Sequence, residues 1–435
     1  MRCIVILSVL FCAMSPAAYP FNSETDTMVT DSTDTLDVLY NNGVEACNAG
    51  DDSIAVGYWS QAAEGGHAEA QYDYALSLFN GTGVEQNYAE AFAWFMKAAE
   101  QKHVEAQFSV GYCYENGIGV EPSFAEVEKW YTMAAGEGHA DAQLSLGIIH
   151  YNGLMGEPNF ALAAEWLKRA AEQGNPEAMC RLGVCYENGH GVEKDEYKAA
   201  VWYKKGAELG HVECIYNLAY CYDWGVGIDY DAGKAIKLYK EAAELGLDIA
   251  QYDVAIYCFE EKDSAEAIKW LEKSAGQGYA DAQYRLGKCY YDGEFVEKDL
   301  EKAVTYFASA AGQDHSDALC DLGYCYLTGA GVNRNIDVAM RWFLLSAKEG
   351  NMRAQHNLGV CSYEGLGVEQ NFEDAVKWFT LAAEQEYADS HYYLGVCYNN
   401  GQGIEKSRSK AIKHLRAAKY GGNEDAAEAL RILSE

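Results

Sequence analysis

The stretch that decides the fold is AEAQYDYALSLFNGTGVEQNYAEAFAWFMKAAEQ, at residues 68–101. Its first part carries small and apolar residues at the i, i+4, i+5 and i+8 spacing of one helix face: Ala70, Tyr74, Ala75 and Leu78. The segment Asn80-Gly81-Thr82-Gly83 follows, and glycine ends helices because it tolerates the left-handed conformation. Its second part repeats the helical spacing at Ala91, Trp94, Phe95, Ala98 and Ala99. The stretch therefore predicts two helices joined by a tight turn.

The same pattern recurs along most of the chain. A small residue follows the leucine or equivalent apolar residue of each first helix, and it falls at Ala75, Gly111, Gly147, Gly183, Ala219, Ala255, Gly287, Gly323, Gly359 and Gly395. The steps are 36 residues, except for one of 32 residues. This period predicts an all-α, right-handed α/α superhelical solenoid of about eleven helix-turn-helix repeats. Ten repeats fill 67–422, and the short repeat at 247–278 lacks only loop residues, so both of its helices should form.

These residues resemble a known family. The stretch at 68–101 and AQHNLGVCSYEGLGVEQNFEDAVKWFTLAAEQ at 354–385 are similar to the Sel-1-like repeat, a relative of the tetratricopeptide repeat. The resemblance covers about 67–422. It implies a superhelix of paired helices, and it implies that the protein is an adaptor or scaffold. It implies no fixed ligand.

The two ends of the chain differ from the repeats. Residues 1–18 combine Arg2, a short apolar run and small residues before Tyr19, which predicts a secretory signal peptide. Residues 19–35 are expected to form a disordered leader, and 36–66 a degenerate first repeat with Trp59 in its aromatic position. Residues 423–435 predict a single helix that covers the open end of the solenoid. The mature protein is expected in a periplasm, in a secretory lumen or outside the cell.

The charge of the chain limits its partners. The formal net charge is −33, from 66 acidic and 33 basic residues. Nucleic acids and anionic membranes require clustered lysine and arginine, so we expect neither as a partner. No segment after the signal peptide is long and apolar enough to predict stable membrane insertion. The acidic surface favours cationic partners and keeps a long solenoid soluble.

The cysteines follow the repeat rather than a metal-binding or disulfide pattern. Seven of the 14 cysteines lie two residues after the small signature position: Cys113, Cys185, Cys221, Cys289, Cys325, Cys361 and Cys397. Equivalent sites in neighbouring repeats should be about 10 Å apart, beyond the reach of a disulfide. We therefore predict buried free thiols. A cysteine-rich bacterial subfamily of Sel-1-like proteins pairs its cysteines at a regular spacing that this chain lacks. Without a C-x-x-C motif or a visible grouping of histidine with cysteine, we predict no metal and no cofactor.

Histidines and glycines also recur at fixed places. His67, His103, His139, His211 and His315 each hold the first position of a repeat, which predicts a turn or capping role. The Gly-x-Gly loops follow no strand and precede no Lys-Ser/Thr pair, so turn formation explains them better than phosphate binding. We therefore predict no catalytic residue among these groups.

Two isolated motifs keep alternatives open. Ser407-Arg408-Ser409-Lys410 matches S-x-x-K, but the companion motifs of β-lactamase-like enzymes are missing. Asn80-Gly81-Thr82 is a sequon that a eukaryotic secretory pathway could glycosylate. A β-lactamase-like hydrolase therefore stays an alternative, as does a binder of glycans or cell-wall fragments.

The variation between repeats suggests where a partner binds. Core positions barely change, whereas two positions of each first helix mix aromatic, charged and polar residues. Tyrosine and arginine are common anchors of interfaces. Six residues at these positions are the candidates for binding a protein or peptide on the concave face: Arg181, Asn217, Tyr220, Arg285, Tyr324 and Asn357. We predict a non-enzymatic scaffold or adaptor.

Overall fold

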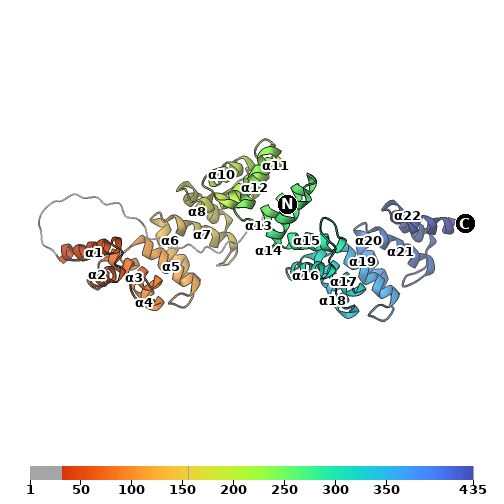
Figure 1. Ribbon diagram of the computed structural model, residues 1–435, viewed down its shortest axis with the longest axis horizontal. Helices are drawn as coiled ribbons and strands as arrows, with labels where there is room; N and C mark the ends of the chain where they lie inside the picture. Colours follow the sequence, from red (N-terminus) through yellow and green to blue (C-terminus); the bar gives the residue numbers. More distant parts are fainter. Residues whose placement is uncertain (1–31, 155, 435) are drawn as a thin grey trace. The chain divides into compact units, whose positions relative to one another are not determined.

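The protein is built entirely from paired helices. The computed structural model describes residues 32–154 and 156–434, and within this range it contains 23 helices and no strand (Figure 1). Odd-numbered helices are the first helices of the repeats and even-numbered helices are the second ones, except that α23 stands alone. The predicted α/α solenoid of eleven repeats is confirmed.

The chain divides into two compact halves, residues 1–235 and 236–435. The described helices of the N-terminal half are α1 (Ser32–Asn48), α2 (Asp52–Glu64), α3 (Ala68–Asn80), α4 (Tyr88–Glu100), α5 (Val104–Asn116), α6 (Phe124–Gly136), α7 (Ala140–Asn152), α8 (Phe160–Glu172), α9 (Pro176–Asn188), α10 (Glu196–Glu208) and α11 (Val212–Trp224). Helix α12 (Ala232–Glu244) contains the boundary between the halves.

The C-terminal half continues the same alternation. Its described helices are α13 (Asp248–Glu260), α14 (Ser264–Gly276), α15 (Ala280–Asp292), α16 (Leu300–Ala311), α17 (Ser316–Thr328), α18 (Ile336–Lys348), α19 (Met352–Glu364), α20 (Phe372–Glu384), α21 (Ala388–Asn400), α22 (Arg408–Tyr420) and α23 (Asp425–Ser434).

Local signals set the ends of each helix. At the start of α3, Nδ1 of His67 accepts a hydrogen bond from the backbone N–H of Ala70 at 3.1 Å. At its end, Gly81 adopts the left-handed conformation with φ of 72°, and its N–H returns to the Ser77 carbonyl. The Asn87 side chain then caps α4 by accepting from the Glu90 N–H at 3.2 Å. These caps confine each helix to almost the same length, which keeps successive repeats in register.

Small residues allow the two helices of a repeat to pack closely. Gly111 on α5 faces Tyr131 on α6, and a Cβ at this glycine would lie 2.5 Å from the tyrosine ring. Tyr131 is fully buried, and its hydroxyl donates a hydrogen bond to Glu115 at 2.6 Å. Large side chains fill the equivalent position in other repeats, among them Phe95, Leu167, Tyr203, Phe307, Phe343 and Phe379. The buried core therefore consists of small clusters, each of which combines residues of adjacent repeats.

Two expectations about the irregular segments can be compared with the structure. The short repeat at 247–278 keeps both helices, α13 and α14, and Lys262 makes the tight turn between them with φ of 64°. Helix α1 begins at Ser32, so residues 32–35 of the expected leader are helical, because the first helix of the degenerate repeat extends farther upstream. Residues 1–31, with the predicted signal peptide, lie outside the described residues. In the described part of the chain, no helix combines the length and apolar character that a membrane span requires.

Candidate functional site

The third, seventh, tenth and fourteenth residues of each repeat share one face of its first helix, because they follow the i, i+4, i+7 and i+11 spacing. We call this set the first-helix stripe. In α9 the stripe consists of Glu177, Arg181, Val184 and Asn188, and in α11 of Glu213, Asn217, Tyr220 and Trp224. All of these side chains except Val184 are half-buried or exposed, so the stripe is accessible to a partner.

Three of the predicted binding residues come together in the N-terminal half. Arg181 on α9 forms an ion pair with Glu177, with Nη2 at 2.7 Å from the carboxylate, and both side chains are only 15% exposed. On the adjoining α11, the Asn217 amide donates a hydrogen bond to the Cys180 sulfur at 3.4 Å. Tyr220 lies one turn farther along α11. These residues form a mixed polar and aromatic surface across two first helices.

Three strongly exposed aromatic side chains of α10, α11 and the loop after α11 were not among the residues predicted from the sequence. Trp224, the last residue of α11, is 68% exposed, and its ring centroid lies 6.2 Å from that of Tyr220. Tyr230, in the loop after α11, and Tyr197, near the start of α10, are exposed to a similar extent. A signal was present, because the four preceding repeats have asparagine in the position of Trp224: Asn80, Asn116, Asn152 and Asn188.

The other three predicted residues lie in the C-terminal half. Tyr324 on α17 is 43% exposed. Arg285 on α15 places its guanidinium 5.5 Å from the centroid of the Phe259 ring, and its Nε is buried without a hydrogen-bond partner among the described residues. Asn357 on α19 donates to the Cys320 sulfur at 3.8 Å. Like the group in the N-terminal half, these three residues combine polar and aromatic side chains, and they come from the three first helices α15, α17 and α19.

The seventh position of a repeat contacts the repeat before it. Asn217 and Asn357 each reach a cysteine in the sixth position of the preceding repeat, and the Tyr284 hydroxyl donates to Asp321 at 3.0 Å in the same arrangement. Arg353 of the following repeat also pairs with Asp321. These polar residues therefore hold neighbouring repeats together, and the exposed aromatic side chains of the stripe, Trp224 and Tyr324, are more accessible to a ligand.

The predicted capping role of the histidines is confirmed for four of them. His67, His103, His139 and His315 each accept the N–H of the third following residue through Nδ1. Burial lowers the pKa of His103, which keeps its ring neutral and its Nδ1 able to accept. The fifth histidine, His211, makes no such bond.

The S-x-x-K motif forms a helix start. Ser407 precedes α22, and its hydroxyl accepts a hydrogen bond from the Lys410 backbone N–H at 3.4 Å. The Lys410 ammonium lies 5.2 Å from the centroid of the Tyr398 ring. The serine and the lysine thus have structural partners, and the motif gives the hydrolase alternative no support.

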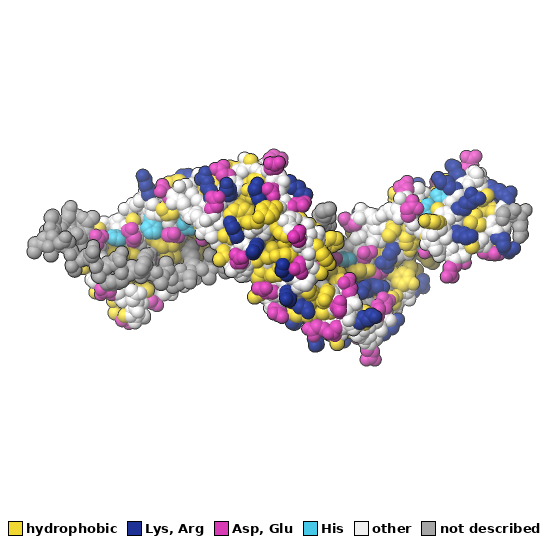
Figure 2. Space-filling model, turned by 90° about the horizontal axis from the view of Figure 1, so that it is seen from above, with side chains coloured by type: hydrophobic (Ala, Val, Ile, Leu, Met, Phe, Trp, Pro, Cys, Tyr) yellow, Lys and Arg dark blue, Asp and Glu magenta, His cyan; other side chains and the backbone are white. Residues whose placement is uncertain are grey.

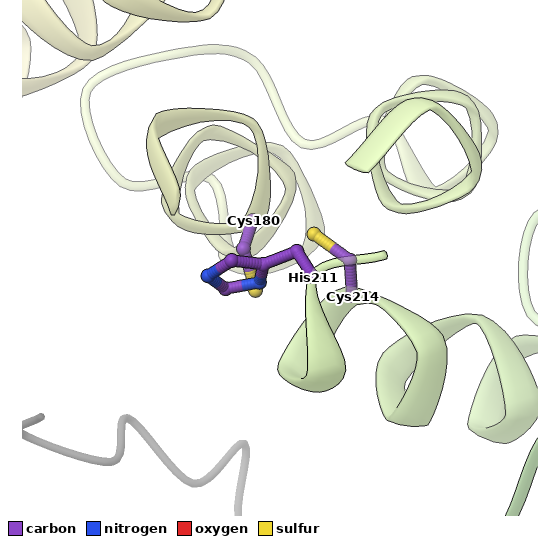
Figure 3. A group of neighbouring side chains, drawn as sticks. All are labelled: Cys180, His211 and Cys214. Atoms are coloured by element: carbon purple, nitrogen blue, oxygen red, sulfur yellow. The ribbon is translucent and has the colours of Figure 1, made fainter. Parts of the chain in front are cut away.

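One expectation about the cysteines is confirmed and another was wrong. None of the 12 described cysteines is in a disulfide, and all except Cys47 are buried, which confirms the prediction for the seven repeated positions. Contrary to the expectation that histidine and cysteine do not group, ligand atoms of Cys180, His211 and Cys214 lie within 4.8 Å of one another (Figure 3). The sequence concealed this group because Cys180 comes from the preceding repeat, 31 residues before His211. A hydrogen bond from the Cys214 thiol, together with the nearby imidazole, lowers the pKa of Cys180, and the same contact raises the pKa of Cys214.

Comparison with known proteins agrees with this architecture. The Sel1 repeat matches the chain at 38–67, 68–103, 104–139, 140–175, 176–211, 212–247, 248–279, 280–315, 316–351, 353–387 and 388–423. The structure of a protective antigen present in uropathogenic Escherichia coli strains, which displays an SLR fold, is similar, with 32% identity, a TM-score of 0.74, and coverage of 92% of this chain and 87% of that one. A Sel1 repeat protein from Oxalobacter formigenes has 31% identity, a TM-score of 0.45, and coverage of 62% of this chain and 96% of that one. No curated protein matches this sequence.

Proposed function

Because this chain belongs to the Sel1 repeat family, we propose that it is an exported, non-enzymatic adaptor that binds partner proteins along its first-helix stripe. Repeat solenoids of this kind commonly mediate protein–protein interaction, since stacked repeats create extended surfaces for binding. The proposed ligand is an extended or helical segment of a protein, held on the concave side of the solenoid. The signal-like residues 1–18 support export.

The observation that carries this proposal is the contrast between the core and the stripe. Buried positions repeat the same small residues, as at Ala70, Ala106, Ala142 and Ala178, whereas the stripe differs from one repeat to the next. Packing alone does not require an exposed tryptophan at residue 224, where five other repeats have asparagine and the remaining four have glutamate, aspartate or threonine. Tryptophan, tyrosine and arginine are enriched among residues that dominate binding energy. Their presence on α9 and α11 favours a protein-binding surface there.

The surface charge supports a partner with cationic groups. Figure 2 shows acidic, basic and hydrophobic side chains reaching the surface together on the face it presents. With a net charge of −33, the chain attracts basic segments over a distance set by the ionic strength. Aromatic side chains of the stripe would then provide the short-range contacts, including cation–π contacts to arginine or lysine of the partner.

Affinity capture from the native compartment tests the proposal. Wild-type protein should retain a specific set of proteins, and the double variant Arg181→Ala, Tyr220→Ala should lose at least about 10-fold of that retention, because hot-spot truncations commonly cost more than 1 kcal/mol. The far-ultraviolet circular dichroism of the variant should equal that of the wild type.

A matched control removes an exposed aromatic residue elsewhere. Tyr420, at the end of α22, is 96% exposed and lies outside the first-helix stripe, so Tyr420→Ala should leave retention unchanged. Equal retention of partner proteins by the wild type and the double variant would contradict the proposed site. Selective binding of glycans or β-lactams in a thermal-shift screen, without any retained protein, would instead favour one of the two alternatives.

A further inference from the structure

The junction between the repeats at 175–210 and 211–246 departs from the repeat pattern at three positions. Cys180 stands in the sixth position, which is aromatic in six repeats: Tyr72, Phe108, Tyr216, Tyr252, Tyr284 and Tyr392. Cys214 stands in the fourth position, which is alanine in eight repeats: Ala70, Ala106, Ala142, Ala178, Ala250, Ala282, Ala318 and Ala354. Gly206, on the preceding α10, replaces the alanine or serine of every other repeat.

The glycine and one of the cysteines depend on each other. A Cβ on Gly206 would overlap the Cys214 sulfur, so the larger side chain at 214 fits only because residue 206 has none. The thiol of Cys214 is fully buried and lies 3.6 Å from the Pro176 carbonyl oxygen on α9. The three departures from the repeat pattern therefore place two thiols at the same junction, and Gly206 leaves room for the sulfur of Cys214.

His211 has lost both contacts that its counterparts make. Elsewhere the histidine of the first position caps its helix and stacks on the aromatic sixth residue of the preceding repeat, as His103 does on Tyr72, with ring centroids 4.6 Å apart. His139 stacks on Phe108 in the same way. At His211 the aromatic partner is replaced by Cys180, the cap is missing, and the buried Nδ1 has no hydrogen-bond partner among the described residues. The imidazole of His211 thus lies next to the two thiols, and its ligand atom and the two sulfurs are within 4.8 Å of one another.

The geometry of the three side chains fits a metal ion. Cys180 comes from α9, His211 from the turn before α11 and Cys214 from the first turn of α11, and Figure 3 shows them converging. In a tetrahedral zinc site, with bonds of about 2.3 Å to sulfur and about 2.0 Å to nitrogen, neighbouring ligand atoms lie about 3.5–3.8 Å apart. The separations of up to 4.8 Å need a contraction of only about 1 Å, which side-chain rotation supplies.

We propose that Cys180, His211 and Cys214 bind one zinc ion through the two sulfurs and Nδ1. Thiolate and imidazole ligands select zinc over magnesium or calcium, which prefer oxygen. The fourth position is left to a water molecule or to Glu213, whose carboxylate lies 3.4 Å from Nδ1 of His211. The ion would fasten α9 to the start of α11, beneath the surface that carries Arg181, Asn217 and Tyr220. This inference is independent of the proposed binding function.

Metal binding by the full chain tests the proposal. Reduced protein without an affinity tag should bind one equivalent of zinc in equilibrium dialysis. Cobalt(II) bound in its place should show a thiolate-to-cobalt charge-transfer band and the intense d–d bands of tetrahedral geometry. Two variants should each weaken zinc binding by at least about 100-fold, more than changes around a metal site usually do. They are His211→Asn and Cys214→Ala, and each introduces the residue that other repeats use at that position, such as Asn175 and Ala178.

Matched controls separate this site from adventitious binding. His139→Asn changes a capping histidine outside the group. Cys320→Ser changes the cysteine equivalent to Cys180 at a junction where Asn351 takes the place of His211. Both should bind zinc as the wild type does. Wild-type affinity in either ligand variant, no binding by reduced wild type, or a Cys180–Cys214 disulfide that remains in the presence of zinc would overturn the proposal.

Discussion

Single side chains in this protein take their role from their position in the repeat. A histidine in the first position caps a helix, as His139 does with Ala142, whereas His356 in the sixth position lies among aromatic rings. Its Nδ1 lies 2.9 Å from the Ser390 hydroxyl, and the rings of Phe379, Tyr387 and Tyr393 surround it. Burial lowers the pKa of His356 to about 4, although Asp389 opposes the shift.

This burial predicts a loss of stability in acid. The folded-state pKa of His356 lies below the ordinary value of 6.5, so the unfolded chain binds the proton first as the pH falls. The destabilising contribution of His356 is small above pH 6.5, and it grows as the pH falls from 6.5 to the folded-state pKa. Acidification from pH 7 to 5 should therefore cost about 2 kcal/mol more in wild type than in His356→Leu, measured by urea unfolding. Leucine is chosen because Leu144 occupies the same sixth position in another repeat. Equal losses in both proteins would contradict the prediction.

Loops connect the helices and also fasten one repeat to the previous one. In the Gly-x-Gly loop after α3, the first glycine ends the helix and the second, Gly83, approaches the start of α2 in the preceding repeat. A Cβ at Gly83 would lie 2.5 Å from the Asp52 backbone. The loop glycines are therefore part of the interface between repeats.

The close approach at Gly83 can be separated from its backbone conformation. Gly83 and Gly50 both have positive φ, of 72° and 82°, but nothing lies within 4 Å of a Cβ built on Gly50. Gly83→Ala should lower the free energy of unfolding by about 1–3 kcal/mol more than Gly50→Ala, because only the former adds an overlap. Thermal melts of the two variants check this difference. Similar melting temperatures would show that the loop moves away from Asp52 at no cost in stability.

At the scale of the whole molecule, the core of each half consists of small clusters, each formed by adjacent repeats. Stability in such an array is close to a sum of repeat and neighbour terms. A local defect should therefore remain local. This behaviour differs from that of a globular domain with one continuous core, which unfolds as a unit.

Truncation of one core aromatic residue tests this locality. Phe343 on α18 is fully buried, and Phe343→Ala should cost about 3–5 kcal/mol in its own cluster. Hydrogen exchange should accelerate in α17 to α20 and remain unchanged in α3 to α6. Uniform acceleration along the whole chain would mean that the array unfolds cooperatively, against the expectation.

Much of the fold could be predicted from sequence because each repeat carries its own signals. Periodic alanines, cap residues and loop glycines specify each helix pair, and neighbouring pairs have only one way to bury their apolar faces. The seven repeated cysteines, such as Cys113, were predicted as buried thiols on the same grounds. The position of Arg181, Asn217 and Tyr220 on adjoining first helices also followed from the period.

What the sequence by itself determined is everything that recurs: the helix pairs, their caps, their loops and the small residues at their contacts. The tertiary structure alone decided which irregular residues meet. Asn217 contacts Cys180, and Cys180 lies beside His211 and Cys214, although Cys180 precedes these three residues by 37, 31 and 34 positions in the sequence. The physical reason is that stacking sets distances across repeats, whereas a sequence period records only positions within them.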